Sequence, residues 1–193
     1  KPVRVYRVRP ETKTVSSSTS QPLELPDKPS IAVLPFVNMS DDPEQEYFSD
    51  GITEDIITDL SKLSGLFVIS RNSSFKYKGT SVDPPTISSE LGVRYVLEGS
   101  VRKAGNRVRV NAQLIDAASD YHVWADRFDR EIKDIFDLQD EITQTIVAEL
   151  RVKLTQDERQ RLERKPTDNL EAYDFYLRGV ESYRQETRGS IIH

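Results

Sequence analysis

A strand, a helix and a second strand follow one another with short joints between residues 31 and 69, and this unit constrains the fold more than any other feature. The run from Ile31 to Phe36 is continuously apolar and has the length of a strand that is covered on both faces. Apolar residues recur at helical spacing from Phe48 to Leu63, and the apolar run from Leu66 to Ile69 follows. Because the crossover of such a unit is right-handed, we expect the two strands to lie parallel in one sheet.

The ends of this helix carry their own signals. Asp42 is a typical N-cap residue, Pro43 suits the first helical position, and Gln45 can complete a capping box. Gly65 stands where a left-handed cap is expected after the helix. The acidic residues between 41 and 46 could also bind a hard metal ion, but a helix start prefers the same residues, and we favour capping.

Three strands joined as hairpins are predicted further along the chain. They cover Val93 to Lys103, Arg107 to Asp116 and Tyr121 to Arg130, and the joints between them have hairpin length. In the middle strand, apolar residues alternate with polar ones, so one face of the sheet should contact water. The pattern indicates an antiparallel meander.

Helices complete the predicted domain, which covers residues 30–154. Asp83 can cap a short helix that ends at Gly92, and Asp134 opens a long helix with one apolar stripe. The predicted fold class is α/β, with a mixed sheet of about five strands in which a βαβ unit precedes the antiparallel meander. Two long helices and one short helix should pack on this sheet, and a helical extension should follow it.

The remaining segments are shorter and differ in composition. Residues 1–9 alternate valine with basic residues, as in the edge strand of a preceding domain. Residues 10–29 are rich in serine, threonine and proline and are expected to form a linker. Residues 155–166 begin with a capping box formed by Thr155 and Glu158 and predict a charged connecting helix.

The last segment, residues 167–193, predicts the start of a tetratricopeptide-like repeat. Leu177, Gly179 and Tyr183 are similar to the leucine, glycine and tyrosine of the first helix of such a repeat. No second helix follows in this sequence, so the apolar stripe should dock on the domain or pair with a second copy. Because Pro166 separates the helix from the domain, we favour pairing between copies as a homodimer. The candidate interaction residues of the stripe are Tyr173, Tyr176 and Leu177.

A second candidate interaction surface follows the strand at residues 66–69. It is a polar loop that extends from residue 72 to residue 83, and its candidate residues are Arg71, Asn72, Ser74 and Tyr77. The carboxyl end of a parallel strand is where open α/β sheets bind ligands. A turn held by asparagine and serine side chains explains the same residues equally well.

Composition excludes several kinds of site. The 193 residues contain no cysteine and only two histidines, so thiolate metal sites are excluded and histidine-based catalysis would depend on His122. Neither the glycine spacing of a phosphate loop nor the nucleophile motif of a serine hydrolase occurs. We therefore expect no catalytic residue, no metal and no cofactor. The net charge of −5 argues against nucleic acid and membrane partners, and we read the basic residues between 93 and 115 as a solvated strand face.

Several motifs resemble one known domain family. They are SIAVLPFVNMS at residues 30–40, EYFSDGITED at 46–55, SRNSS at 70–74, ELGVRYVLEGS at 90–100 and ADRFD at 125–129. In this order they resemble the TolB N-terminal-like domain, which many bacterial class III adenylate/guanylate cyclases and some transcriptional regulators carry ahead of tetratricopeptide repeats. Residues 1–8 are similar to the last strand of a class III cyclase catalytic domain. The metal-binding aspartates and transition-state residues of that catalytic domain match nothing in this chain.

The resemblance implies a non-catalytic regulatory or protein-interaction region of an adenylate or guanylate cyclase. Protein partners would bind through the α/β domain and the repeat helices, and the location would be the cytoplasm, where a cyclase finds its nucleotide. A small-ligand or nucleotide sensor domain is the alternative function, and a hydrolase or transferase is the third.

Overall fold

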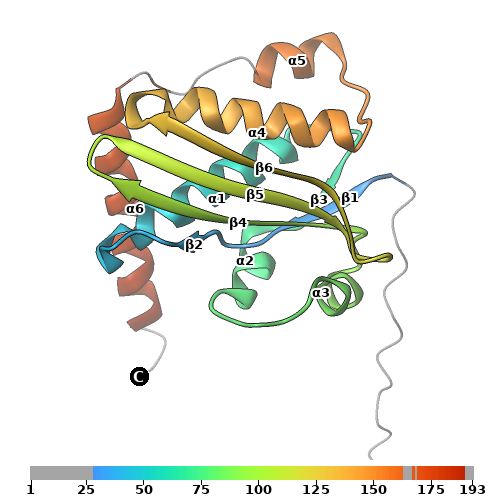
Figure 1. The fold of residues 1–193 in the computed structure, drawn as a ribbon, viewed down its shortest axis with the longest axis horizontal. Helices are drawn as coiled ribbons and strands as arrows, with labels where there is room; N and C mark the ends of the chain where they lie inside the picture. The colour runs from blue at the N-terminus through green and yellow to red at the C-terminus, as the bar shows by residue number, and fades with distance from the viewer. Residues whose placement is uncertain (1–27, 163–166, 168, 190–193) are drawn as a thin grey trace, which may run out of the picture.

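The computed structural model describes residues 28–162, 167 and 169–189, which form one mixed sheet with helices on both faces (Figure 1). The strands are β1 (Ser30–Val33), β2 (Val37–Asn38), β3 (Phe67–Val68), β4 (Tyr95–Ala104), β5 (Arg107–Asp116) and β6 (Tyr121–Glu131). The α-helices are α1 (Glu46–Ser61), α2 (Arg71–Ser74), α3 (Pro84–Leu91), α4 (Ile135–Glu149), α5 (Gln156–Leu162) and α6 (Leu170–Gly189). Three 3-10 turns join them: η1 (Pro43–Gln45), η2 (Phe75–Tyr77) and η3 (Ile132–Asp134). The predicted edge strand at residues 1–9 lies outside the described residues, as does nearly all of the predicted linker.

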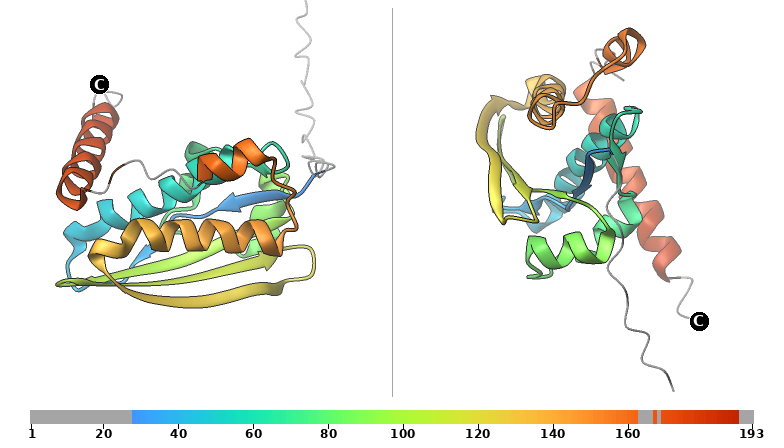
Figure 2. Two further views of the ribbon diagram at one scale, coloured as in Figure 1. Left: turned by 90° about the horizontal axis from the view of Figure 1, so that it is seen from above. Right: turned by 90° about the vertical axis from the view of Figure 1, so that its right-hand side faces the viewer.

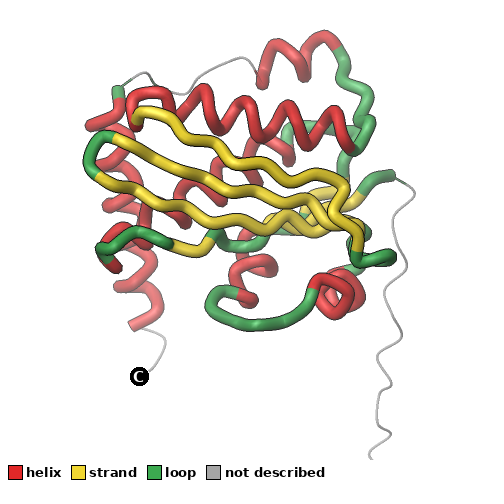
Figure 3. The backbone as a smooth tube through the Cα atoms, in the orientation of Figure 1, coloured by secondary structure: helices red, strands yellow, loops and turns green. Residues whose placement is uncertain are grey.

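The sheet confirms the predicted α/β class and both of its parts. Its strand order is β3-β1-β4-β5-β6, with β2 paired to β4 beside this path. β1 is parallel to β3 and to β4, whereas β4, β5 and β6 form the antiparallel meander (Figure 3). The short strand β2 is the one that the sequence did not predict, and it is also parallel to β4.

The two faces of the sheet are covered by different helices. α1 and α4 pack side by side on one face and bury the inward residues of the meander, including Leu97 and Leu114 (Figure 2). The neighbouring residue Val96 points to the other face, where it packs with Ile87 of α3. Because both faces are covered at β1, all four of its residues are buried, which explains its continuous apolar sequence.

Some of the predicted helix caps are confirmed by the structure and one is wrong. Asp83 caps α3 by accepting the Thr86 N–H at 3.0 Å, and Gly92 ends the helix with a φ of 66°. Asp42 caps the turn η1, which leads into α1. The prediction for Gly65 is wrong, because α1 ends at Ser61 and Gly65 has no positive φ. A Cβ at Gly65 would lie 3.1 Å from Val152 Cγ1, so the glycine allows close packing instead.

The predicted polar loop at residues 72–83 is wrong in its first half. Residues 71–77 form the short helix α2 and the turn η2. Two buried side chains, Phe75 and Ser74, hold this segment against the domain. The sequence did not predict the helix α2 because a single turn has too few residues to show a periodic apolar pattern.

The capping box predicted at the start of α5 is present, and its Glu158 also contacts a second segment of the chain. The Thr155 N–H donates to Glu158 Oε2 at 2.8 Å, and the Glu158 N–H donates to Thr155 Oγ1 at 3.2 Å. Glu158 Oε1 accepts the Ser64 N–H at 2.7 Å, so α5 is tied to the turn between α1 and β3. Hydrogen bonds from the Ser64 and Thr155 backbones lower the pKa of Glu158 from 4.5 to about 2.

We expect Glu158→Gln to lower the thermal midpoint at neutral pH. The carboxylate accepts the Ser64 N–H, the Thr155 N–H and the Thr155 hydroxyl, and an uncharged amide cannot accept these three donors as well. Since the folded pKa is depressed, the stabilisation by Glu158 is present above about 4.5 and is lost as the pH falls toward about 2. Thermal melts across this range should therefore converge for the two proteins at low pH. Glu149→Gln, an exposed position on α4, is the matched control and should leave the midpoint unchanged. A constant gap between the Glu158→Gln variant and the wild type at every pH would contradict this account.

Candidate functional site

The terminal helix α6 docks on α1 of its own domain (Figure 2). Tyr173 and Leu177 are 5% and 6% exposed, so two of the three candidate stripe residues are buried inside one chain. Leu177 lies over Gly51 of α1, where a Cβ would approach Leu177 Cδ2 to 2.5 Å. In the structure the stripe therefore docks on its own domain, which is the alternative that the sequence analysis did not favour.

A buried polar network joins α6 to two other helices. The Tyr173 hydroxyl donates to Asp55 Oδ2 on α1 and accepts from Gln139 Nε2 on α4 at 3.0 Å. Gln139 Nε2 also donates to Asp55 Oδ2, at 2.8 Å. Burial raises the pKa of Asp55, although both hydrogen bonds favour its charged form. Burial also raises the pKa of Tyr173, which keeps the hydroxyl protonated as a donor.

A second anchor lies about two turns away along α1, at the start of the helix. The Tyr47 hydroxyl donates to Asp174 Oδ1 at 2.6 Å, and the guanidinium of Arg178 lies 5.0 Å from the centre of the Tyr47 ring. Burial, followed by the bond to Asp174, raises the pKa of Tyr47 to about 12. Both anchors therefore rest on protonated tyrosines across the physiological pH range.

The third anchor brings together the two predicted interaction surfaces. Glu54 of α1 accepts Arg71 Nε at 3.0 Å and Arg184 Nη2 of α6 at 2.6 Å. Arg71 also stacks over the Phe75 ring, 3.7 Å from its centre. One carboxylate thus bridges the segment after β3 and the terminal helix, which are far apart in the sequence.

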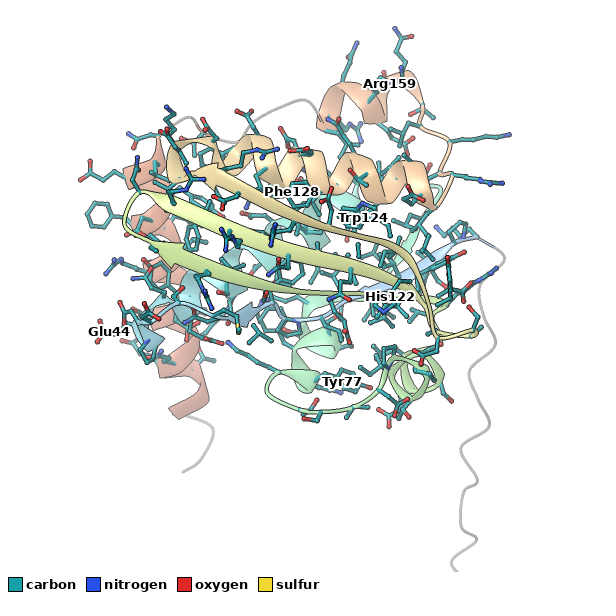
Figure 4. The ribbon with its side chains drawn as sticks, viewed as in Figure 1. Glu44, Tyr77, His122, Trp124, Phe128 and Arg159 are labelled. Atoms are coloured by element: carbon teal, nitrogen blue, oxygen red, sulfur yellow. The ribbon has the colours of Figure 1, made fainter. Side chains whose placement is uncertain are left out.

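The other residues predicted in the loop take different positions. Asn72 is exposed. Ser74 is fully buried, and its hydroxyl has no hydrogen-bond partner within the described part of the chain. Tyr77 lies near the small core under α3, and its hydroxyl donates to Glu90 (Figure 4). Of the four loop residues, Arg71 is therefore the one in contact with the α6 interface.

Sequence reasoning missed the residues of α1 that receive α6. Gly51, Glu54 and Asp55 lie in a helix whose apolar spacing is otherwise regular, and two carboxylates beside a glycine were the available signal. Asp50 of the same helix is buried and accepts Lys78 Nζ at 2.6 Å, and burial raises its pKa. The residues that these α1 side chains contact are distant in the sequence, so residue spacing alone could not identify the interface.

The docked helix leaves a groove and an aromatic outer face. The groove, of about 430 Å³, is lined by α1, α4 and α6 and includes Phe136, Tyr173 and Tyr176. Phe175, Tyr176 and Tyr183 are exposed on α6. The described residues contain no cluster of metal-ligating side chains, and none of their helices is both long and apolar enough to span a bilayer.

Comparison with known sequences gives two matches. A family model described as "HilA/YgeH-like transcriptional regulator, second domain" matches residues 27–145. The chain is also 56% identical over 188 residues to "Putative adenylate cyclase 3" of Rhizobium meliloti (strain 1021), an alignment that covers 96% of this chain and 32% of that relative. The chain thus spans about a third of the relative's length. The matching family model has a different name from the predicted TolB N-terminal-like domain.

Comparison with solved structures gives weaker likenesses. TolB from Acinetobacter baumannii has a TM-score of 0.47 at 16% identity, covering 67% of this chain and 30% of that one. Lipoprotein GNA1162 from Neisseria meningitidis has a TM-score of 0.46 at 22% identity, covering 65% of this chain and 99% of that one. Likenesses at this level carry no functional argument.

Proposed function

Because this chain belongs to the family described as HilA/YgeH-like transcriptional regulator, second domain, we propose that it is a non-catalytic regulatory and protein-interaction region of an adenylate cyclase-like protein. Two different outputs, transcription and cyclic nucleotide synthesis, appear in the names of the proteins that it resembles. Because the domain occurs in proteins named for either output, we infer that its role is independent of transcription and of cyclic nucleotide synthesis. A role that fits both is to respond to a partner and to pass that response along the chain.

The observation that carries this proposal is the docking of α6 on α1. Tyr173, Asp174 and Arg184 each engage a polar side chain of α1, and Leu177 fills the space over Gly51. We propose that α6 has a second, released arrangement in addition to the docked one. We propose that a partner biases this equilibrium and that the position of α6 is the signal.

The partner that we propose is a protein. Three exposed aromatic side chains on α6, Phe175, Tyr176 and Tyr183, support it, because aromatic residues are enriched in protein interfaces. The proposal places the protein in the cytoplasm and includes no catalytic residue, cofactor, nucleic acid or membrane contact.

A small-ligand sensor remains the second candidate, and one observation favours it. The groove of about 430 Å³ beside Tyr173 combines an aromatic wall with the polar groups of Asp55 and Gln139. Such a combination is typical of small-molecule sites. A ligand bound there would stabilise the docked helix and act on the same equilibrium.

The test uses the Rhizobium meliloti relative, because its aligned third can be exchanged for this chain. We expect deletion of that third to change the rate of cyclic AMP formation and replacement by this chain to restore it. Replacement by this chain with Tyr173→Ala, which releases α6, should fail to restore the rate. This chain alone should convert no ATP. The proposal fails if deletion leaves the rate unchanged or if this chain alone forms cyclic AMP.

A further inference from the structure

A basic groove with an apolar floor lies at the corner between α4 and α5. It has a volume of about 780 Å³ and is lined by no carboxylate. Its floor is formed by Val147, Ala148, Val152, Leu154 and Leu162, and its cations are Arg151, Lys153 and Arg159. Figure 4 shows Arg159 at this corner.

The three cations of the corner groove lie close together and are not neutralised by a carboxylate of the described residues. Arg94, Arg107 and Arg130 each pair with a carboxylate within 4 Å. Within the described ranges, the side chains of Arg151, Lys153 and Arg159 form no ion pair or hydrogen bond. The corner therefore carries positive charge that is available to a partner.

Backbone strain at one of these residues points to function. Arg151 follows α4 with a φ of 52°, in the left-handed region that favours glycine. Its N–H donates to the Ala148 carbonyl, and the Val152 N–H donates to the Val147 carbonyl, as in the cap where glycine is the usual residue. An arginine at a position better suited to glycine indicates that its charge serves a purpose other than stability.

A complementary surface lies at the corner formed by β2 and η1, which includes Glu44 (Figure 4). Val37 and Met39 are 58% and 48% exposed there, beside the exposed acidic residues Asp41 and Glu44. These two carboxylates have no partner within the described residues. In the view of Figure 4, Glu44 and Arg159 lie at opposite corners of the molecule, so the two surfaces cannot meet within one chain.

We propose that the corner groove binds the acidic corner of a second copy of this chain, with Val37 and Met39 on its floor and Asp41 and Glu44 facing its cations. The two surfaces carry charges of opposite sign, and both contain accessible apolar residues. Because the contact joins different surfaces of identical chains, it repeats from head to tail. No aromatic residue lines the groove for base stacking, and its apolar residues lie inside the groove, where a flat bilayer does not reach them.

Association through so small a contact should be weak and sensitive to salt. We expect sedimentation velocity at low ionic strength to show a mass that grows with concentration from about 10 μM to about 1 mM. Raising the salt from about 50 mM to about 500 mM should weaken the association about tenfold, since surface charges are then screened.

Paired variants test the geometry. Arg151→Glu with Arg159→Glu reverses the charge of the groove, and Asp41→Asn with Glu44→Gln removes the charge of the acidic corner. Each double variant alone should stay monomeric. A mixture of the two still contains one intact groove and one intact corner, so it should form a 1:1 dimer that grows no further. Phe175→Ser with Tyr176→Ser on α6 is the control and should associate like the wild type.

Arg151→Gly separates association from folding. Glycine relieves the strain at φ 52°, so the urea midpoint should rise while the dissociation constant increases about tenfold. Four results would overturn the proposal. The first is a wild type that stays monomeric up to about 1 mM, and the second is a mixture of the two double variants that forms no 1:1 dimer. The third is loss of association in the α6 control. The fourth is a chain that remains monomeric but sediments with phosphatidylglycerol vesicles in a way that depends on Arg151 and Arg159.

Discussion

Tyr173→Ala is expected to release α6 from α1 at a cost of about 3–5 kcal/mol, the range for truncation of a buried aromatic residue. The substitution removes the ring that packs edge-on against Phe136, 4.9 Å between centroids, and it leaves Asp55 without its hydroxyl donor. Since α6 is joined to the rest of the chain through a connecting segment, the cost should appear as local opening. Hydrogen exchange should lose protection in residues 170–189 while β5 stays protected.

Tyr173→Phe is the matched control, because it keeps the ring and removes only the hydroxyl. We expect a loss of about 1–3 kcal/mol while Asp55 is charged, because its carboxylate is then partly unpaired. The lost hydrogen bond had favoured the charged form, so the pKa of Asp55 should rise further in this variant. The stability gap to the wild type should therefore narrow as the pH falls through the raised pKa of Asp55 and the carboxylate becomes protonated in the folded state. Full protection of α6 in the alanine variant would show that Tyr173 does not hold the helix. Equal losses in the two variants would contradict a contribution from the ring.

Gly99→Ala is expected to destabilise the whole domain by about 3 kcal/mol, the upper end for overpacking of a core. A Cβ at Gly99 in β4 would lie 2.6 Å from two ring atoms of Phe36 and 2.7 Å from the Asn111 carbonyl oxygen of β5. The carbonyl belongs to the paired strand and the Phe36 ring is fully buried, so neither can yield without moving the sheet. Urea unfolding should show a lower midpoint for every probe.

Gly179→Ala is the control for Gly99→Ala, since a Cβ added at Gly179 in α6 would have nothing within 4 Å of it. Alanine should raise stability there by up to about 1 kcal/mol, because it is the better helix former. Stability changes of opposite sign at Gly99 and Gly179 would show that the close contact at Gly99, and not the loss of a glycine as such, determines the result. A Gly99→Ala variant as stable as the wild type would mean that β4 and Phe36 can separate at little cost.

Substitutions on α6 distinguish the two proposals. Release of α6 should alter the output of the chain in the cyclase exchange experiment, whereas head-to-tail association should survive substitution of the outer face of α6. The two surfaces share the helix α4 but use different residues of it, Phe136 and Gln139 for the first and Val147 and Ala148 for the second. Failure of either proposal would therefore leave the other intact.

The sequence alone determined the parts of the structure that depend on near neighbours. The limits of β5 are those predicted, because an alternating strand between two tight turns is specified by its own residues. The caps at Asp83, Gly92 and Thr155 were predictable for the same reason, since each satisfies backbone groups within one turn. The parallel pairing of β1 with β3 followed from the handedness of a short βαβ unit.

Only the tertiary structure decided the place of α6 and the chemistry around it. Tyr173 and Asp55 are 118 residues apart and Arg184 and Glu54 are 130 apart, and no local pattern specifies which buried carboxylate a tyrosine or an arginine will meet. Sequence periodicity identified the apolar stripe on α6 but not its partner, because a stripe is equally satisfied by its own domain or by a second copy. The space that Gly51 leaves for Leu177 favoured its own domain, since close contact there buries the stripe without the entropy cost of association.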